Sequence, residues 1–326
     1  MEKTGGIEPK YRDDFEANVI LNLTDDAICN FSATVRISGD KKDHINSDLM
    51  SSLDVKLLTG NSFGITKFKL FLPNTRNNDN EIVVTTLLEE IGFISPRSFY
   101  VDVGILNWSN QFTVNKYIFQ EKQSKEMIEH NYFREGPLIE TNESFYWDFL
   151  DTKVEDPALT NPLFIGRIIN KYWSKKNINS AIITLEALEV YNQAIFNSYM
   201  PSKQINYSYL GDDEDLFFKF DAANFALLND HAITTHQRKF FFDKINNQFH
   251  PIYYDGNSNF LELGHIRWRE YYLEYPKLYK AAAKLYEEIN INRESFNKKL
   301  NNRGLNINKE ESDALVDKFL NNLNNI

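Results

Sequence analysis

Two aspartates in the last third of the chain lie at the ends of regular elements, where carboxylates often do chemistry. Asp230 follows a helix predicted over 213–228, and Asp255 follows the apolar run 251–254. A short hairpin joins the two positions, so we expect the two carboxylates to meet at one point. Such a pair suits a divalent cation with a general base, or a general acid with a general base. The alternative interpretation is structural, with 255–257 as a simple turn and Asp230 as a helix stop.

A second candidate group combines strand lysines with a helix carboxylate. Lys56 and Lys69 are each flanked by apolar residues on predicted strands, and Glu81 lies in the first turn of a helix predicted over 80–91. Several phosphotransferases hold nucleotide phosphates with a strand lysine that pairs with a helix carboxylate. A solvated strand lysine and an acid at a helix start would also be ordinary. The sequence leaves the choice between the two lysines open.

The histidines and the single cysteine carry weaker signals. His231 and His236 lie on one loop, but their spacing is not the i,i+4 spacing of a helical zinc motif. Cys29 is the only cysteine, which excludes an internal disulfide and a cysteine-based zinc cluster. The sequence contains no Walker A, dinucleotide-binding, nucleophile-elbow or H-E-x-x-H motif.

The helices and strands that would position these candidates can be predicted from the sequence pattern, which changes from β-type to helical along the chain. The first third alternates in short β-type runs that one helix interrupts, and from about residue 123 the pattern is mainly helical. The predicted strands are 19–23, 33–37, 53–57, 68–72, 98–103, 117–120, 239–242 and 251–254, and the predicted later helices are 178–199, 213–228 and the region 263–325. We expect an α+β fold with two lobes and a ligand site in the cleft between them.

Composition narrows the classes of partner. The chain has 326 residues and a formal net charge of −10, so nucleic acid and anionic membranes would be repelled at long range. A small anionic ligand held by a local cluster of positive groups remains compatible with this balance. No apolar run is long enough to cross a membrane, and residues 1–6 lack the apolar core of a signal peptide.

Five segments carry a family resemblance when taken in order: residues 68–76, 80–97, 117–122, 236–243 and 251–256. Together they resemble the family of spore-coat protein H (CotH) kinases, and the likeness extends from about residue 33 to 260. It implies an atypical protein-kinase-like, bilobal fold. The β-rich N-terminal lobe would span 1–122 and the mainly helical C-terminal lobe 123–326. It also implies an ATP- and Mg²⁺-dependent kinase that phosphorylates a protein hydroxyl.

The resemblance assigns roles to individual residues. Asp230 matches the catalytic-loop aspartate, and Asp255 matches the metal-binding aspartate. Gln237 stands where the family usually has an asparagine metal ligand, a departure that leaves the second metal position open. Glu121 lies in the segment that would form the hinge, where adenine meets backbone groups. Glu81 would be the helix partner of the phosphate-binding lysine, either Lys69 or Lys56.

Two further features bear on the resemblance. The serine-rich turn of the family is replaced here by residues 39–44, and Arg76 and Arg238 are additional candidates for neutralising phosphate charge. The expected partners are a nucleotide and a protein substrate, without nucleic acid, and the oligomeric state is open. The compartment is open as well, between the bacterial cytoplasm and, if a leader was removed, the cell envelope.

Two alternatives to an active kinase remain. One is a kinase-like surface or coat protein that binds a partner and has lost turnover, which the Gln237 departure favours. The other is a hydrolase that works with a carboxylate pair around a sugar cleft. The tryptophans that would line such a cleft are scattered along the sequence.

Overall fold

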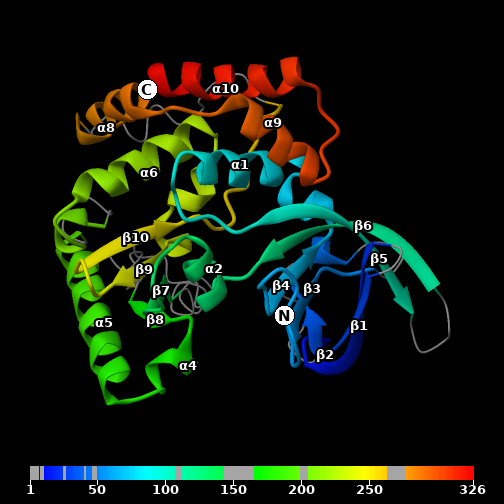
Figure 1. The fold of residues 1–326 in the computed structure, drawn as a ribbon. Helices are drawn as coiled ribbons and strands as arrows, with labels where there is room; N and C mark the ends of the chain where they lie inside the picture. Colours follow the sequence, from blue (N-terminus) through cyan, green and yellow to red (C-terminus); the bar gives the residue numbers. More distant parts are fainter. Residues whose placement is uncertain are drawn as a thin grey trace, which may run out of the picture.

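The computed structural model describes residues 7, 11–24, 27–39, 42–45, 50–106, 112–142, 165–198, 205–262 and 276–326. Within these ranges the chain forms two antiparallel sheets and a set of helices, as Figure 1 shows, which confirms the expected α+β class. In the described part of the chain, no helix is both long and apolar enough to cross a membrane.

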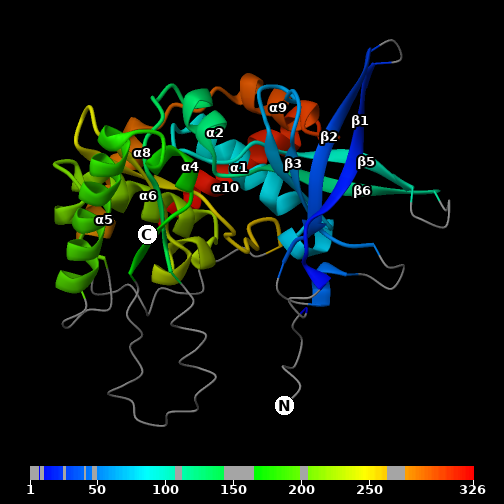
Figure 2. The ribbon, with the colours of Figure 1, turned by 90° about the horizontal axis from the view of Figure 1, so that it is seen from below.

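The first sheet has six strands in the order β1-β2-β3-β4-β6-β5, and every neighbouring pair is antiparallel. Its strands are β1 (Phe15–Thr24), β2 (Ala27–Ile37), β3 (Leu53–Leu57), β4 (Lys67–Phe71), β5 (Ser98–Leu106) and β6 (Phe112–Glu121). Each strand predicted in this region is confirmed. Figure 2 shows the β1–β2 and β5–β6 pairs extending beyond the shorter central strands.

The alternation of side chains gives this sheet two different faces. One face carries the apolar core formed by Ala33, Val35, Val55, Leu57, Phe68, Leu70, Tyr117 and Phe119. The other face packs Phe71 and Ile118 against the helix α1 (Asp79–Glu90). Full burial of a large apolar side chain contributes about 1.5–3 kcal/mol relative to exposure, so both faces hold the sheet in place.

Helix α1 follows a short 3-10 turn, η3 (Pro73–Arg76), and two asparagines with positive φ, Asn77 at 51° and Asn78 at 55°. Asparagine tolerates this region better than most residues, which allows the sharp change of direction before the helix. Gly92, at φ 85°, ends α1, and its amide donates to the Glu89 carbonyl at 3.1 Å. The helix predicted over 80–91 is therefore confirmed within one residue.

The second sheet has four strands in the order β10-β9-β7-β8. Its strands are β7 (Leu138–Thr141), β8 (Gly166–Ile168), β9 (Lys239–Asp243) and β10 (Gln248–Ile252). The last strand begins earlier than predicted and ends before Tyr253, whose amide donates instead to the Ile94 carbonyl at 2.9 Å. This hydrogen bond joins the segment after β10 to the segment after α1.

The remaining helices lie mostly in the second half of the chain. They are α2 (Lys125–His130), α4 (Lys171–Ser174), α5 (Ile178–Ser198), α6 (Glu214–Ala226), α8 (Pro276–Glu288), α9 (Arg293–Asn302) and α10 (Lys309–Asn324). The predictions of helices over 178–199 and 213–228 are confirmed. Three helices occupy most of 276–324, where helices were predicted, while 263–275 falls outside the described residues.

The C-terminal helices hold α1 directly. Arg303, just after α9, donates to the Thr86 hydroxyl at 2.8 Å and forms an ion pair with Glu89, and Lys299 pairs with Glu89 at 2.8 Å and with Glu90 at 2.6 Å. The largest apolar core accordingly continues from α1 through α6 to α8, α9 and α10. Residues on both sides of position 122 therefore share one core.

Candidate functional site

A row of polar side chains crosses the first sheet on the face opposite its apolar core. The register pairs Arg36 with Asp54, Asp54 with Lys69, Lys69 with Gln120, and Gln120 with Ser98. Residues opposite one another on adjacent strands place their side chains on the same face, so five strands contribute one polar side chain each. Strand register thus gathers residues that lie far apart in the sequence.

Asp54 is the member of this row whose negative charge is balanced by two neighbouring cations. Its carboxylate accepts hydrogen bonds from Lys122 at 2.7 and 2.9 Å and from Arg36 at 3.1 Å. Burial alone would raise the pKa of Asp54, but the charge and hydrogen bond of Lys122 hold that pKa below its ordinary value. Because two cations already share this carboxylate, Asp54 does not form an ion pair with Lys69.

Lys69, the next member of the row, is the cation without a close partner. Among the described residues its ammonium makes no hydrogen bond or ion pair, and it lies 5.3 Å from the ring centre of Phe71 and 5.8 Å from that of Tyr254. Burial and then the Arg76 charge lower the pKa of Lys69. A partly buried cation of this kind is unfavourable until an anion compensates it.

Asp255 is engaged from two sides. Arg76 Nη1 lies 2.9 Å from Asp255 Oδ1, and the Arg76 guanidinium stacks on Phe71 with Cζ 3.9 Å from the ring centre. His231 Nδ1 lies 2.7 Å from the Asp255 backbone carbonyl. Burial would raise the pKa of Asp255, but the Arg76 charge, followed by His231 and Lys69, holds that pKa below its ordinary value.

The turn that carries Asp255 has strained backbone. Asp255 and Asn257 both have φ 48°, so the left-handed conformation falls on these residues and not on Gly256. Gly256 is required for space, because a Cβ there would lie 2.7 Å from the Tyr253 hydroxyl oxygen and 3.0 Å from Asn229 Cγ. The Gly256 amide donates to the Tyr253 hydroxyl at 3.2 Å, which stabilises the turn.

Glu81 lies on α1 but does not pair with a strand lysine, so this expectation was wrong. Its carboxylate accepts hydrogen bonds from Gln120 Nε2 at 2.5 Å and from the Tyr253 hydroxyl at 3.0 Å. Burial raises the pKa of Glu81 to about 7. Gln120 lies between Lys69 and Glu81 and takes the position that the lysine was expected to fill. Lys56 is exposed on β3, which leaves Lys69 as the better-placed lysine.

Asp230 begins the 3-10 turn η6 (Asp230–Ile233) and is half-buried. Burial raises the pKa of its carboxyl group. The next residue, His231, makes the hydrogen bond to the Asp255 carbonyl described above, so the loop after α6 contacts the turn after β10, while the meeting of the two carboxylates stays a prediction. The two aspartates therefore belong to one region of the molecule.

Two other candidates are engaged elsewhere, and a third, Gln237, makes no hydrogen bond to Asp255 in the described part of the chain. Glu121 is paired with Arg97 by two hydrogen bonds of 2.8 Å, and its amide donates to the Arg97 carbonyl, so neither group is available to a nucleotide. Arg238 binds Asp221 at 2.5 and 2.9 Å in a buried pair. Gln237 lies in the 3-10 turn η7 (Thr235–Gln237) and makes no hydrogen bond to Asp255, both being described residues.

Asn229 is a site residue that the sequence analysis missed. Its side chain is fully buried, and its Oδ1 has no hydrogen-bond partner in the described part of the chain. The orientation of its amide is set, because Asn229 Nδ2 donates to Asn224 Oδ1 at 3.2 Å and Asn224 Nδ2 donates to the Phe220 carbonyl at 2.8 Å. A buried acceptor oxygen beside Gly256 is therefore left open. An asparagine after a helix is also an ordinary stop, so the sequence carried no separate signal.

The oxygen atoms near the turn suit a hard divalent cation. Among the described residues no three His, Cys, Asp or Glu side chains gather closely enough to hold a metal by themselves. Mg²⁺, however, commonly uses one or two protein oxygens and completes its coordination with water and substrate phosphates. The Asp255 carboxylate and the unpartnered Asn229 oxygen fit such a site.

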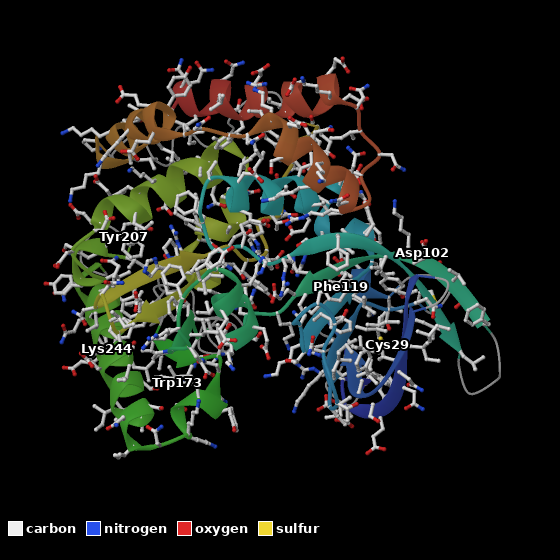
Figure 3. The ribbon with its side chains drawn as sticks, viewed as in Figure 1. Cys29, Asp102, Phe119, Trp173, Tyr207 and Lys244 are labelled. Atoms are coloured by element: carbon white, nitrogen blue, oxygen red, sulfur yellow. The ribbon has the colours of Figure 1, made fainter. Side chains whose placement is uncertain are left out.

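The cysteine and the described tryptophan lie apart from this region. Figure 3 shows Cys29 among the strands of the first sheet and Trp173 in the opposite half of the molecule. Cys29 pairs in register with Leu21, and Trp173 is a buried residue of α4. Both therefore have the environment of packing residues, and the other three tryptophans lie outside the described ranges.

Comparison with known proteins adds no assignment. No protein-family model matches the sequence. No curated protein matches it either. The functional argument therefore rests on the geometry of this site and on the residues that carry the resemblance.

Proposed function

We propose that this chain is an ATP- and Mg²⁺-dependent kinase that transfers the γ-phosphate to a serine or threonine hydroxyl of a protein, as the resemblance to the CotH kinases implies. The observation that carries the proposal is the Lys69 ammonium, which lacks an ion pair among the described residues and lies in one charge cluster with Arg76 and Asp255. A polyphosphate would compensate this cation and would bring a divalent cation to the neighbouring carboxylate.

The proposed fold is kinase-like and bilobal, with lobes at 1–122 and 123–326. The order β4–α1–β5 supports it, because the phosphate-binding lysine precedes a helix that packs on the same sheet. The origin of the site residues supports it too. Lys69 and Arg76 come from the first part of the chain, and Asp230 and Asp255 come from the second.

In this proposal each site residue has its own role in phosphate transfer. Lys69 and Arg76 neutralise phosphate charge, and Asp255 with Asn229 would hold Mg²⁺, which when bound supplies further neutralisation of the phosphate oxygens. Asp230 orients the acceptor hydroxyl and takes its proton, a role that a raised pKa favours. Glu81 acts through Tyr253 on the turn of Asp255 and makes no phosphate contact of its own.

The test is transfer of labelled γ-phosphate to a generic protein or to the chain itself. Wild type is compared with Asp255→Asn and Asp230→Asn, and Asp102→Asn serves as the control because Asp102 is an exposed residue of β5, labelled in Figure 3. We expect labelling to fall at least about 100-fold in the first two variants and to stay unchanged in the control. Equal labelling in all four proteins would overturn the proposal.

A second candidate function is a kinase-like binding protein without turnover. Two observations favour it: Gln237 makes no hydrogen bond to Asp255, both being described residues, and Arg76 forms an ion pair with the Asp255 carboxylate. A titration with ATP and Mg²⁺ followed by thermal unfolding separates the candidates when combined with the transfer assay. Ligand at 100 times Kd stabilises by about 2.7 kcal/mol, so a nucleotide binder without turnover shows a raised Tm and no labelling.

A further inference from the structure

His44 enters the site region from the connection between β2 and β3. It ends the 3-10 turn η2 (Lys42–His44) and is only 9% exposed. Its ring centre lies 6.0 Å from that of Phe71. Its Nδ1 atom is buried and has no hydrogen-bond partner among the described residues.

Contact with Gly39 sets the direction in which the His44 ring faces. A Cβ at Gly39 would lie 2.0 Å from His44 Cδ2 and 2.5 Å from Nε2, so this edge of the imidazole lies directly on the glycine backbone. Nδ1 is on the other edge of the ring. Nδ1 is also buried, and the ring that carries it lies beside Phe71.

Three nitrogen-bearing side chains surround Phe71. Lys69 Nζ lies 5.3 Å from the ring centre, Arg76 Cζ lies 3.9 Å from it, and the His44 ring lies 6.0 Å from it. Arg76 uses Nη1 for Asp255, but its Nε is buried without a partner in the described part of the chain. One ammonium and two side chains that each carry a buried nitrogen without a partner in the described ranges thus lie near the same buried ring.

The charges that face His44 leave this cluster positive. Arg76, Asp43, Lys69 and Asp255 act on the imidazole. Asp43 is exposed, and Asp255 balances only one of the two cations. Burial and the Arg76 charge lower the pKa of His44, which keeps the ring neutral, and a neutral imidazole with its proton on Nδ1 donates a hydrogen bond without adding charge.

We propose that His44, Lys69 and Arg76 form an oxyanion site that binds a phosphate group, with His44 Nδ1–H and Arg76 Nε–H as donors and Lys69 as the charge. Lys69 supplies a compact positive charge, and Arg76 presents fixed planar donors. The identification of this group as a nucleotide phosphate rests on the proposed function. The oxyanion site itself rests on the three nitrogens and their burial.

The test uses the full chain and three probes without Mg²⁺: inorganic phosphate, pyrophosphate and ATP. The imidazole nitrogen resonances of His44 are followed by NMR, and affinities are measured by calorimetry. We expect pyrophosphate to shift the His44 Nδ1 resonance. We also expect His44→Phe, which keeps a ring and removes the donor, to weaken pyrophosphate binding about tenfold. His44→Asn restores a donor near the Nδ1 position and should stay within about threefold of wild type.

Two controls separate the site from general charge effects. His130→Phe on α2 and Lys280→Met on α8 alter exposed residues and should leave pyrophosphate affinity unchanged, whereas Lys69→Met should abolish binding. If ATP binds but pyrophosphate and phosphate do not, the nucleotide is held by other groups and the oxyanion site is wrong.

The outcomes also separate this inference from the proposed function. The role of His44 is overturned if its Nδ1 resonance does not move on saturation with pyrophosphate, or if His44→Phe binds pyrophosphate with wild-type affinity. In either case the transfer assay on Asp255 still decides whether the protein is a kinase. Should His44→Phe fail to fold, the wild-type resonance and His44→Asn decide the question. Conversely, pyrophosphate binding through His44 without any phosphate transfer supports the site and contradicts the kinase.

Discussion

The hydroxyl of Tyr253 donates to the Glu81 carboxylate at 3.0 Å and accepts from the Gly256 amide at 3.2 Å. One side chain therefore links α1 to the strained turn that presents Asp255. The proposed metal-binding residue is thus positioned by a carboxylate that lies more than 170 residues earlier in the chain. This relationship replaces the lysine–glutamate pair that the sequence suggested.

Tyr253→Phe removes both of these hydrogen bonds. It leaves the buried Glu81 with one donor fewer and the Gly256 amide without a partner, which we expect to lower the free energy of unfolding by about 1–3 kcal/mol. Urea unfolding measures this loss. The transfer rate should fall as well, because the Asp255 turn is no longer held. Tyr132→Phe on an exposed tyrosine is the control, and an equal effect of both substitutions would contradict the link.

Glu81 makes stability depend on pH. Its folded pKa of about 7 is raised above the ordinary value of 4.5, so the folded protein binds the proton more tightly than the unfolded chain does. The contribution of Glu81 to stability is therefore fully present below about 4.5 and is lost as pH rises through the interval between about 4.5 and about 7. Glu81→Gln mimics the protonated acid and should flatten this part of the profile.

Urea unfolding at pH 5 and pH 8 measures that change. Glu129→Gln, on an exposed carboxylate of α2, should keep the wild-type slope. If Glu81→Gln and Glu129→Gln show the same dependence on pH, Glu81 is not the group that titrates.

Lys69→Met should stabilise the ligand-free protein. The folded pKa of Lys69 is lowered, so the unfolded chain binds this proton more tightly and wild-type stability should rise as pH increases toward 10.5. Replacing a partly buried cation by an apolar side chain of similar length should raise the free energy of unfolding at pH 7 by about 1 kcal/mol. Denaturant unfolding checks the sign, and Lys280→Met, with its exposed side chain, should change it by less than about 0.5 kcal/mol. If Lys69→Met lowers the free energy of unfolding, Lys69 stabilises the folded protein without a ligand, which contradicts its role as an uncompensated, ligand-binding cation.

Gly39→Ala tests the contact that orients His44. Gly39 has φ 91° and its added Cβ would lie 2.0 Å from His44 Cδ2, so the ring must move. We expect pyrophosphate affinity to fall about tenfold, as with His44→Phe. Calorimetry on Gly64→Ala gives the control, since Gly64 also has positive φ but has nothing within 4 Å of the added Cβ. Equal affinity in both variants would show that the His44 position does not matter.

The sequence by itself determined the local elements. Period-two alternation predicted the strands of the first sheet, and the local pattern predicted a helix over 80–91, because these signals depend on neighbours within a few residues. It also nominated Asp230 and Asp255 from their places at the ends of elements. The short strands β7 and β8 were missed, since three or four residues carry too little periodicity.

Only the tertiary structure decided which groups meet. Strand register placed Lys69 beside Gln120 and left Lys56 exposed, and packing between distant segments joined Arg76 to Asp255. The buried atoms without partners in Asn229 and His44 had no counterpart in any local pattern. Whether a buried polar atom has a hydrogen-bond partner depends on residues that are remote in the chain, so local sequence patterns do not predict which atoms are left without one.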